Sequence, residues 1–290
     1  MTFHDVPYEN DILYLLFTKY KLDINQSYRF GLKKILDEGY SQHNPFTDNQ
    51  RSTASFWNYS SSYSYMSYWK AGHTMVNKIL EGNGVEGTRF HKSQLPMNDI
   101  IVVPFKDPLD KMMSAYFTSA SFKIQHKELF ELTQFPTAGN YKSLVEDTYE
   151  LLDTFMRSSL DVDSFSAIGT YGEENQSSNL LHYDNHFMPI HILLYFALAN
   201  KERRFKLVGF NLDQRDMEYV FFDIANNNKI DEQFKSLLLN YQTANNKFLK
   251  TVAYKWKIDN PDVVSKIIEK FLSNDYKLIW KLQQNNIITK

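Results

Sequence analysis

Cysteine is missing from all 290 residues of the chain. Disulfides, thiolate metal sites, iron–sulfur clusters and a cysteine nucleophile are therefore excluded, and folding requires no oxidising compartment. No run approaches the roughly 18 apolar residues of a membrane span, and the first residues lack the basic and apolar regions of a secretory signal. We therefore expect a cytoplasmic protein without a membrane span.

An excess of basic charge is also missing, because 32 Lys and Arg residues face 34 Asp and Glu residues. No globally basic nucleic-acid-binding surface is expected, although a local basic site is compatible with this balance. What the chain does have is a hydrophobic share of 43% and an aromatic share of 16%. A chain of this length and composition buries a large core, and its ordinary share of charged residues excludes global disorder.

Short apolar runs alternate with longer segments of helical periodicity. Strands are expected at Ile100–Phe105 and at residues 64–69, 165–169 and 205–210. Helices are expected at residues 27–38, 71–81, 109–120, 143–157, 213–224, 231–254, 261–272 and 275–284. Ser143 and Glu146 form the pattern of a capping box, which places the helix start at residue 143. The alternation predicts a single α/β domain over residues 1–290, with a mostly parallel central sheet flanked by helices, a polar loop at residues 42–62 and a helical C-terminal third.

The first informative motif reads Trp-Lys-Ala-Gly-His-Thr at residues 69–74, between a predicted strand and a predicted helix. Gly72 permits a tight turn, and the free N–H groups at the start of the helix favour an anion. Lys70 adds a positive charge and Thr74 a hydroxyl donor, so the motif predicts a phosphate site. The spacing differs from a Walker A loop, because the lysine precedes the glycine. The alternative is an ordinary strand–helix turn with a solvated lysine.

The second motif reads Lys-Asp-Pro-Leu-Asp-Lys-Met-Met-Ser-Ala-Tyr at residues 106–116. Lys106 follows a predicted strand, and Ser114 lies two turns along the helix after it. Ligands of open α/β sheets bind at the carboxyl ends of the strands, so Lys70 and Lys106 together predict a phosphate site at two strand ends. Alternatively, Lys106 and Asp107 form an ordinary surface ion pair.

Together these motifs resemble the two nucleotide-binding signatures of sulfotransferases that use 3′-phosphoadenosine 5′-phosphosulfate (PAPS). In that family a P-K-x-G-[TS]-[TS] element holds the 5′-phosphosulfate, and an R-[DNE]-P-x-[DE]-R-x-x-S-x-[YF] element holds the 3′-phosphate through its arginine and serine. The resemblance implies a P-loop-like fold. The nucleotide contacts that it implies are Lys70, Ala71, Gly72, His73, Thr74, Met75, Lys106 and Ser114.

Two further segments are similar to the carbohydrate branch of that family. His186-Phe-Met-Pro189 followed by Phe-Lys-Leu-Val-Gly at residues 205–209 is similar to its H-W-x-P … [FY]-D-F-[IV]-G run. Phe-Leu-Ser-Asn-Asp-Tyr-Lys-Leu-Ile at residues 271–279 resembles its Y-x-x-D-[YF]-x-L-F segment. The matches occur in the family's order, and the first two are the specific ones.

The chain departs from the family pattern at several positions. Lys106 and Lys111 stand where the family has arginines, which keeps the charge but loses the bidentate fork. His73 replaces a small hydroxyl residue. No R-K-G element is present for the far end of the nucleotide, and Lys255 and Lys257 are loose candidates for its role.

The resemblance implies in-line transfer of the sulfuryl group from PAPS to a hydroxyl or amine of a sugar, glycolipid or small natural product, with 3′-phosphoadenosine 5′-phosphate (PAP) as the product and no metal. Lys70 then stabilises the leaving phosphate and a histidine acts as general base. His186, oriented by Asp184, ranks above His91, and His182 is a weaker third candidate. Nucleotide-binding elements are expected at about residues 64–120, and acceptor-shaping elements at about residues 42–62 and 180–285.

Two alternatives stay open. The first is a degenerate sulfotransferase fold that binds a nucleotide or a glycan without turnover, since fold alone does not establish function. The second is a P-loop kinase acting on a small molecule. The lysine placement and the missing Mg²⁺-binding aspartate after a strand disfavour the kinase.

Overall fold

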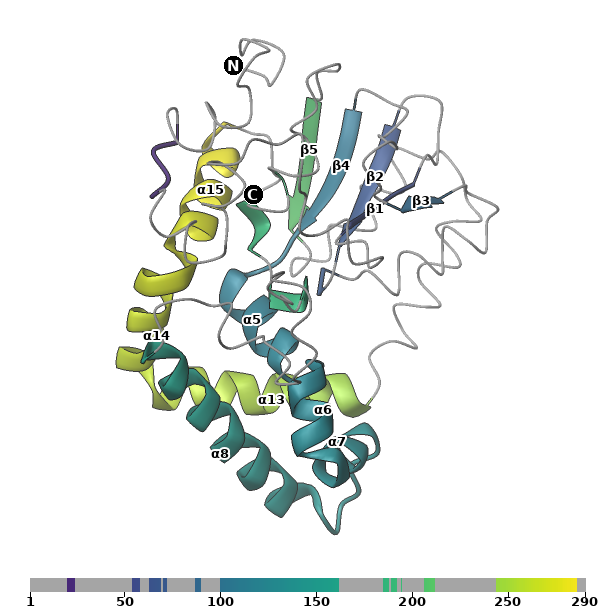
Figure 1. The fold of residues 1–290 in the computed structure, drawn as a ribbon, viewed down its shortest axis with the longest axis vertical. Helices are drawn as coiled ribbons and strands as arrows, with labels where there is room; N and C mark the ends of the chain where they lie inside the picture. The colour runs from purple at the N-terminus through teal and green to yellow at the C-terminus, as the bar shows by residue number, and fades with distance from the viewer. Residues whose placement is uncertain are drawn as a thin grey trace, which may run out of the picture.

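A computed structural model describes a mixed α/β structure, with a sheet in the upper part of Figure 1 and most of the helices below it. The described residues are 20–23, 54–57, 63–68, 70–71, 87–89, 100–161, 185–187, 189–191, 194, 206–211 and 244–285. The helices expected at residues 27–38 and 213–224, residues 72–81 and 231–243 of two other expected helices, and the strand expected at residues 165–169 lie outside this part of the chain.

The sheet has the strand order β3-β1-β2-β4-β5. In chain order the strands are β1 (Ala54–Trp57), β2 (Tyr63–Tyr68), β3 (Gly87–Arg89), β4 (Ile100–Phe105) and β5 (Lys206–Asn211). The strands β2, β4 and β5 are parallel and form the half of the sheet that sequence periodicity predicts. β4 reads as a continuous apolar run because both of its faces are covered, and its central residues are fully buried.

The other half of the sheet corrects the prediction. β1 pairs antiparallel with both β2 and β3, so only part of the sheet is parallel. β1 also lies inside residues 42–62, where a polar loop is expected. β1 and β3 have four and three residues, which is too short for a clear alternation of polar and apolar side chains.

The described helices cover the lower end and one side of the sheet (Figure 1), some of them between β4 and β5 in the chain and the rest after β5. They are α5 (Pro108–Tyr116), α6 (Ala120–Gln125), α7 (Lys127–Gln134), α8 (Tyr141–Leu160), the 3₁₀ turn η4 (Asn185–Phe187), α13 (Ala244–Asp259), α14 (Pro261–Ile267), the π-helical turn η6 (Ile268–Leu272) and α15 (Ser273–Gln284). The helical character predicted for the C-terminal third is confirmed over residues 244–285. α13 runs five residues past its predicted end and stops at Asp259, before Pro261.

Two helix boundaries differ from their predictions for local reasons. α5 ends at Tyr116 because the Ser119 hydroxyl donates to the Tyr116 carbonyl and accepts from the N–H of Phe122, which starts α6. α8 starts at Tyr141, and the Ser143 hydroxyl donates to the Asn140 carbonyl at 3.1 Å. The predicted capping box is therefore wrong, because Ser143 already lies in the first turn of the helix.

The core joins α5, α6, α8 and the C-terminal helices. Phe117 and Phe122 are 3% and 1% exposed and belong to this core. Trp256 of α13 is fully buried, and its indole N–H donates to Asp153 of α8 at 3.0 Å. Full burial of such large apolar side chains stabilises the fold by about 1.5–3 kcal/mol each.

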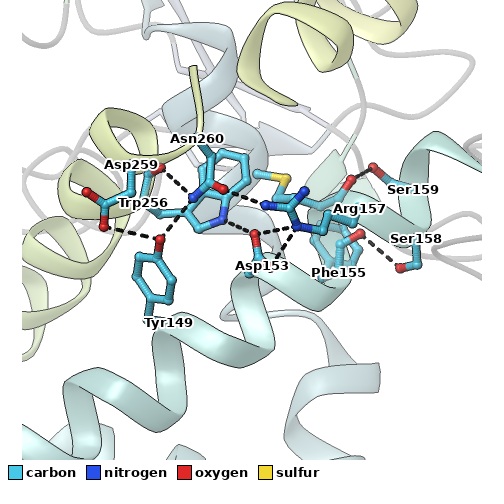
Figure 2. Close-up of polar contacts among 10 residues, drawn as sticks. Tyr149, Asp153, Phe155, Arg157, Ser158, Ser159, Trp256, Asp259 and Asn260 are labelled. Carbon is cyan, nitrogen blue, oxygen red and sulfur yellow. Dashed lines mark hydrogen bonds and ion pairs between the residues drawn. The ribbon is translucent and has the colours of Figure 1, made fainter. Parts of the chain in front are cut away.

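A polar joint connects α8 to the boundary between α13 and α14 (Figure 2). The Asn260 amide donates to the Tyr149 hydroxyl at 2.9 Å and accepts from Arg157 at 2.6 Å. Arg157 also pairs with Asp153, four residues earlier on α8. Partial burial alone raises the pKa of Asp153, but hydrogen bonds from Arg157 and Trp256 and the Arg157 charge lower it below its ordinary value. The joint thereby fixes the crossing of α8 and α13.

Candidate functional site

The ends of β2 and β4 lie level with each other at one edge of the sheet. The strands are parallel neighbours with Tyr65 opposite Val102, so Tyr68 and Phe105 end them at the same height. The Tyr68 hydroxyl donates to the Pro104 carbonyl at 2.5 Å and ties the two ends together. Neighbouring strands lie about 5 Å apart. The structure therefore places the predicted phosphate-binding residues that follow these strands at one edge.

Lys70 lies in the turn directly after β2, where it is half-buried. Its backbone has a φ of 68°, in the left-handed region that favours glycine. This conformation costs a residue with a side chain about 1–2 kcal/mol, and such strain concentrates at functional sites. Ala71 follows in the same turn and is fully buried, with its N–H directed at the Tyr68 carbonyl at 3.4 Å. Gly72, His73, Thr74 and Met75 lie outside the described residues.

Lys106 and the start of α5 lie at the end of β4. Asp107 is the N-cap of α5, because its carboxylate accepts from the N–H of Asp110 at 2.8 Å, and Pro108 occupies the first turn. Lys106 directly precedes this cap and is half-buried. Ser114 lies seven residues after the cap, about two turns along the same face. The positive end of the helix dipole and Lys106 thus share one location.

Lys111 connects α5 to the segment that carries the candidate base. Its side chain is 3% exposed, and its ammonium donates to the His186 carbonyl in η4 at 3.1 Å. His186 is half-buried beside α5, since η4 and α5 are in contact. The other candidate bases, His91 and His182, and the orienting Asp184 lie outside the described residues.

Of the two loose candidates for the far end of the nucleotide, Lys257 contacts α5. Its ammonium pairs with Asp110 at 2.6 Å, with both side chains about one-third exposed. Lys255 instead lies over the ring of Tyr149 at 5.1 Å. The exposed pair of Lys257 and Asp110 contributes little stability, but it places a third lysine near the α5 N-terminus.

Asp275 in the first turn of α15 is a buried carboxylate that binds the segment after His186. Its side chain is 1% exposed. The carboxylate accepts hydrogen bonds from the backbone N–H groups of Ile190 at 2.9 Å and His191 at 3.0 Å, and it pairs with the His191 ring at 2.6 Å. Burial alone raises the pKa of Asp275, but the His191 charge and these hydrogen bonds outweigh it and lower the pKa below its ordinary value.

The residues on either side of Asp275 bind two other segments. The Tyr276 hydroxyl donates to the second carboxylate oxygen of Asp107 at 2.8 Å. Its burial, and then the Asp107 charge, raise the pKa of Tyr276. The Asn274 amide accepts from the Asp23 N–H at 2.7 Å and donates to the Asp23 carbonyl at 2.8 Å. Sequence reasoning missed these roles, although a signal existed: Asn274 and Asp275 interrupt an otherwise apolar face that includes Phe271 and Leu278.

Comparisons with protein-family models, curated proteins and solved structures find no match to this chain. Within the part that the structure describes, no group of three or more potential metal ligands is present. None of the described helices has the length and apolar character needed to cross a membrane. The functional argument therefore depends on the geometry of the site itself.

Proposed function

We propose that this protein is a cytoplasmic sulfotransferase with a P-loop-like fold that transfers the sulfuryl group of PAPS to a hydroxyl or amine of a sugar, glycolipid or small natural product. One observation carries the proposal: Lys70 and Lys106 follow the level ends of two neighbouring parallel strands. A strained turn follows one strand and a capped helix of nine residues follows the other. Elements of this kind, at the carboxyl ends of parallel strands, suit a sulfuryl donor that carries a 5′-phosphosulfate and a 3′-phosphate.

The convergence of distant segments gives further support. The motif at residues 106–116 contacts His186 through Lys111 and the segment at residues 271–279 through the pair Asp107–Tyr276. In that last segment, the Asp275 carboxylate also caps the start of the helix that follows Pro189. Hydrogen bonds thus join segments on which the resemblance depends and which lie up to 169 positions apart.

Each of these residues has a role in the proposed reaction. Lys106 and Ser114 hold the 3′-phosphate, and Lys70 binds the 5′-phosphosulfate. His186 takes the proton of the acceptor hydroxyl as the acceptor oxygen bonds to sulfur. The bond between sulfur and the phosphate oxygen breaks, and Lys70 stabilises the charge that this oxygen gains. PAP and the sulfated acceptor leave.

The first test is binding of PAP, ADP, and ATP with Mg²⁺, measured by isothermal titration calorimetry. We expect PAP to bind most tightly. Lys106→Ala removes a charged contact and should weaken PAP binding about 10- to 100-fold, and Ser114→Ala should weaken it several-fold. The exposed Lys142 and Ser265 supply the matched alanine controls, which should bind PAP as the parent does. Preference for ATP with Mg²⁺ would favour the kinase and overturn the proposal.

The second test separates chemistry from folding at Lys70. Transfer from labelled PAPS to an acceptor panel should lose about 100- to 1,000-fold in kcat in Lys70→Ala, which meets the same backbone penalty as lysine. Lys70→Gly relieves the left-handed strain, so it should unfold at a higher urea concentration and still be inactive. Near-full activity in either variant would show that Lys70 has no catalytic role.

A second function is favoured by one observation at Lys111. This residue occupies the position of the family's second arginine, yet it is 3% exposed and its ammonium donates to a backbone carbonyl. A cation used in this way contributes less to a phosphate site, which favours a protein that binds the nucleotide without turnover. Tight PAP binding with no transfer to any acceptor would establish this alternative.

A further inference from the structure

Three consecutive side chains at the start of α15 each bind a different, distant segment of the chain. Asn274 binds the backbone of Asp23, Asp275 binds the backbone of residues 190–191, and Tyr276 binds Asp107. We call residues 274–276 the α15 anchor. In Figure 1 the short N-terminal segment, in purple, lies beside α15, in yellow.

The π-helical turn η6 explains how these polar side chains come to point inward. The buried residues Val263, Ile267, Phe271 and Asp275 are spaced by four. Each step of four residues rotates an α-helix about 40° past a full turn, so the buried line would move steadily around the helix. A π-helical turn contains more residues per turn and takes up part of this rotation. η6 also contacts α5, so this irregularity lies against the proposed nucleotide-binding helix.

Asp107 links the anchor to the start of α5. One of its carboxylate oxygens caps α5 through the N–H of Asp110, and the other accepts the Tyr276 hydroxyl. Tyr276 therefore fixes the rotamer of the cap that directly follows Lys106. Loss of the hydroxyl leaves the cap in place but frees its orientation.

Asp275 performs the corresponding role for the segment that carries the candidate base. Its carboxylate holds the N–H groups of Ile190 and His191 at the start of a helix, four residues after His186. His186 in turn is fixed to α5 through Lys111. Neighbouring anchor residues thus set the positions of two elements that the proposed reaction must align.

We propose that Asp275 and Tyr276 are positioning residues: Tyr276 orients the nucleotide-binding start of α5, and Asp275 orients the segment that bears His186. The inference rests on the proposed function for its catalytic meaning. Its structural part, that each residue controls one element, is measurable in the protein without any nucleotide. The two residues are expected to act on different kinetic constants, because they hold different elements.

The experiment combines hydrogen exchange with steady-state kinetics in Tyr276→Phe and Asp275→Asn, with Tyr254→Phe as a control on an exposed tyrosine. Tyr276→Phe should speed exchange in the first turn of α5 and raise the KM for PAPS and the Kd for PAP about tenfold, with kcat within twofold. Asp275→Asn should speed exchange at residues 190–191 and lower kcat at least tenfold, with the Kd for PAP within twofold. Tyr254→Phe should change none of these.

The outcomes distinguish the two ideas. If the parent protein binds no PAP but exchange rises at the predicted places, the anchor stands and the proposed function fails. If the parent turns over PAPS but both variants leave hydrogen exchange and kinetics unchanged, the positioning role is wrong. The role is also wrong if each variant changes KM, Kd and kcat together and speeds hydrogen exchange along the whole chain.

Discussion

Asp275→Ala removes a buried carboxylate that accepts three hydrogen bonds, from two backbone N–H groups and the His191 ring. Alanine leaves these donors without an acceptor in a region where Asp275 is 1% and His191 is 0% exposed. Breaking a buried charged pair in this way lowers the free energy of unfolding by about 3–5 kcal/mol, and this value includes the loss of the helix cap. Because domains are stable by only about 5–15 kcal/mol, the variant should be close to the limit of folding.

The assay is urea unfolding followed by circular dichroism at several pH values. The exposed Asp147 of α8 supplies the control, and Asp147→Ala should change the free energy of unfolding by less than about 0.5 kcal/mol. The lowered pKa of Asp275 means that its contribution is complete above the ordinary value of 3.8 and is lost as the pH falls through the folded-state value. The difference between the parent and Asp275→Ala should therefore shrink below about pH 4.

Two results would refute this reasoning. A loss of less than about 1 kcal/mol near neutral pH would mean that the donors find other acceptors. A difference that stays constant from neutral to strongly acidic pH would mean that the carboxylate charge is not the stabilising group.

Two further predictions concern α8. Asn260→Ala should lower the free energy of unfolding by about 2–4 kcal/mol, because it removes the amide that Tyr149 and Arg157 share at the helix joint (Figure 2). Urea unfolding measures this change, and a loss below about 0.5 kcal/mol would show that water replaces the amide. Thr148→Val should stabilise the protein by about 1 kcal/mol, because its fully buried hydroxyl has no hydrogen-bond partner among the described residues; a lower melting temperature in differential scanning calorimetry would contradict this.

Local sequence patterns predicted the central strands and the start of α5. The run Ile100–Phe105 and the proline three residues after it carry their structural signals within a few residues. The placement of Lys70 and Lys106 after the carboxyl ends of two strands was also predictable, because each lysine follows a strand pattern.

The rest of the site was not predictable in this way, because its contacts join positions far apart. Tyr276 and Asp107 are 169 positions apart, and Asp275 and Ile190 are 85 apart. Polar residues on the apolar face of α15 mark a buried contact, but they do not identify the distant segment that each one binds. The segment at residues 271–279 therefore served only as weak support for a family resemblance, although three of its side chains bind distant segments. The left-handed backbone of Lys70 likewise has no signature in the residue itself.

The α15 anchor has a consequence for biosynthesis. The sheet strands and α5 emerge from the ribosome well before residues 274–276, and domains made mainly of early contacts can form as they emerge. Here the contacts that orient α5 and the His186 segment close only once α15 has been made, over separations that make them slow to form. A nascent or truncated chain that stops before α15 would thus carry both lysines and the candidate base, yet lack the contacts that orient them for chemistry.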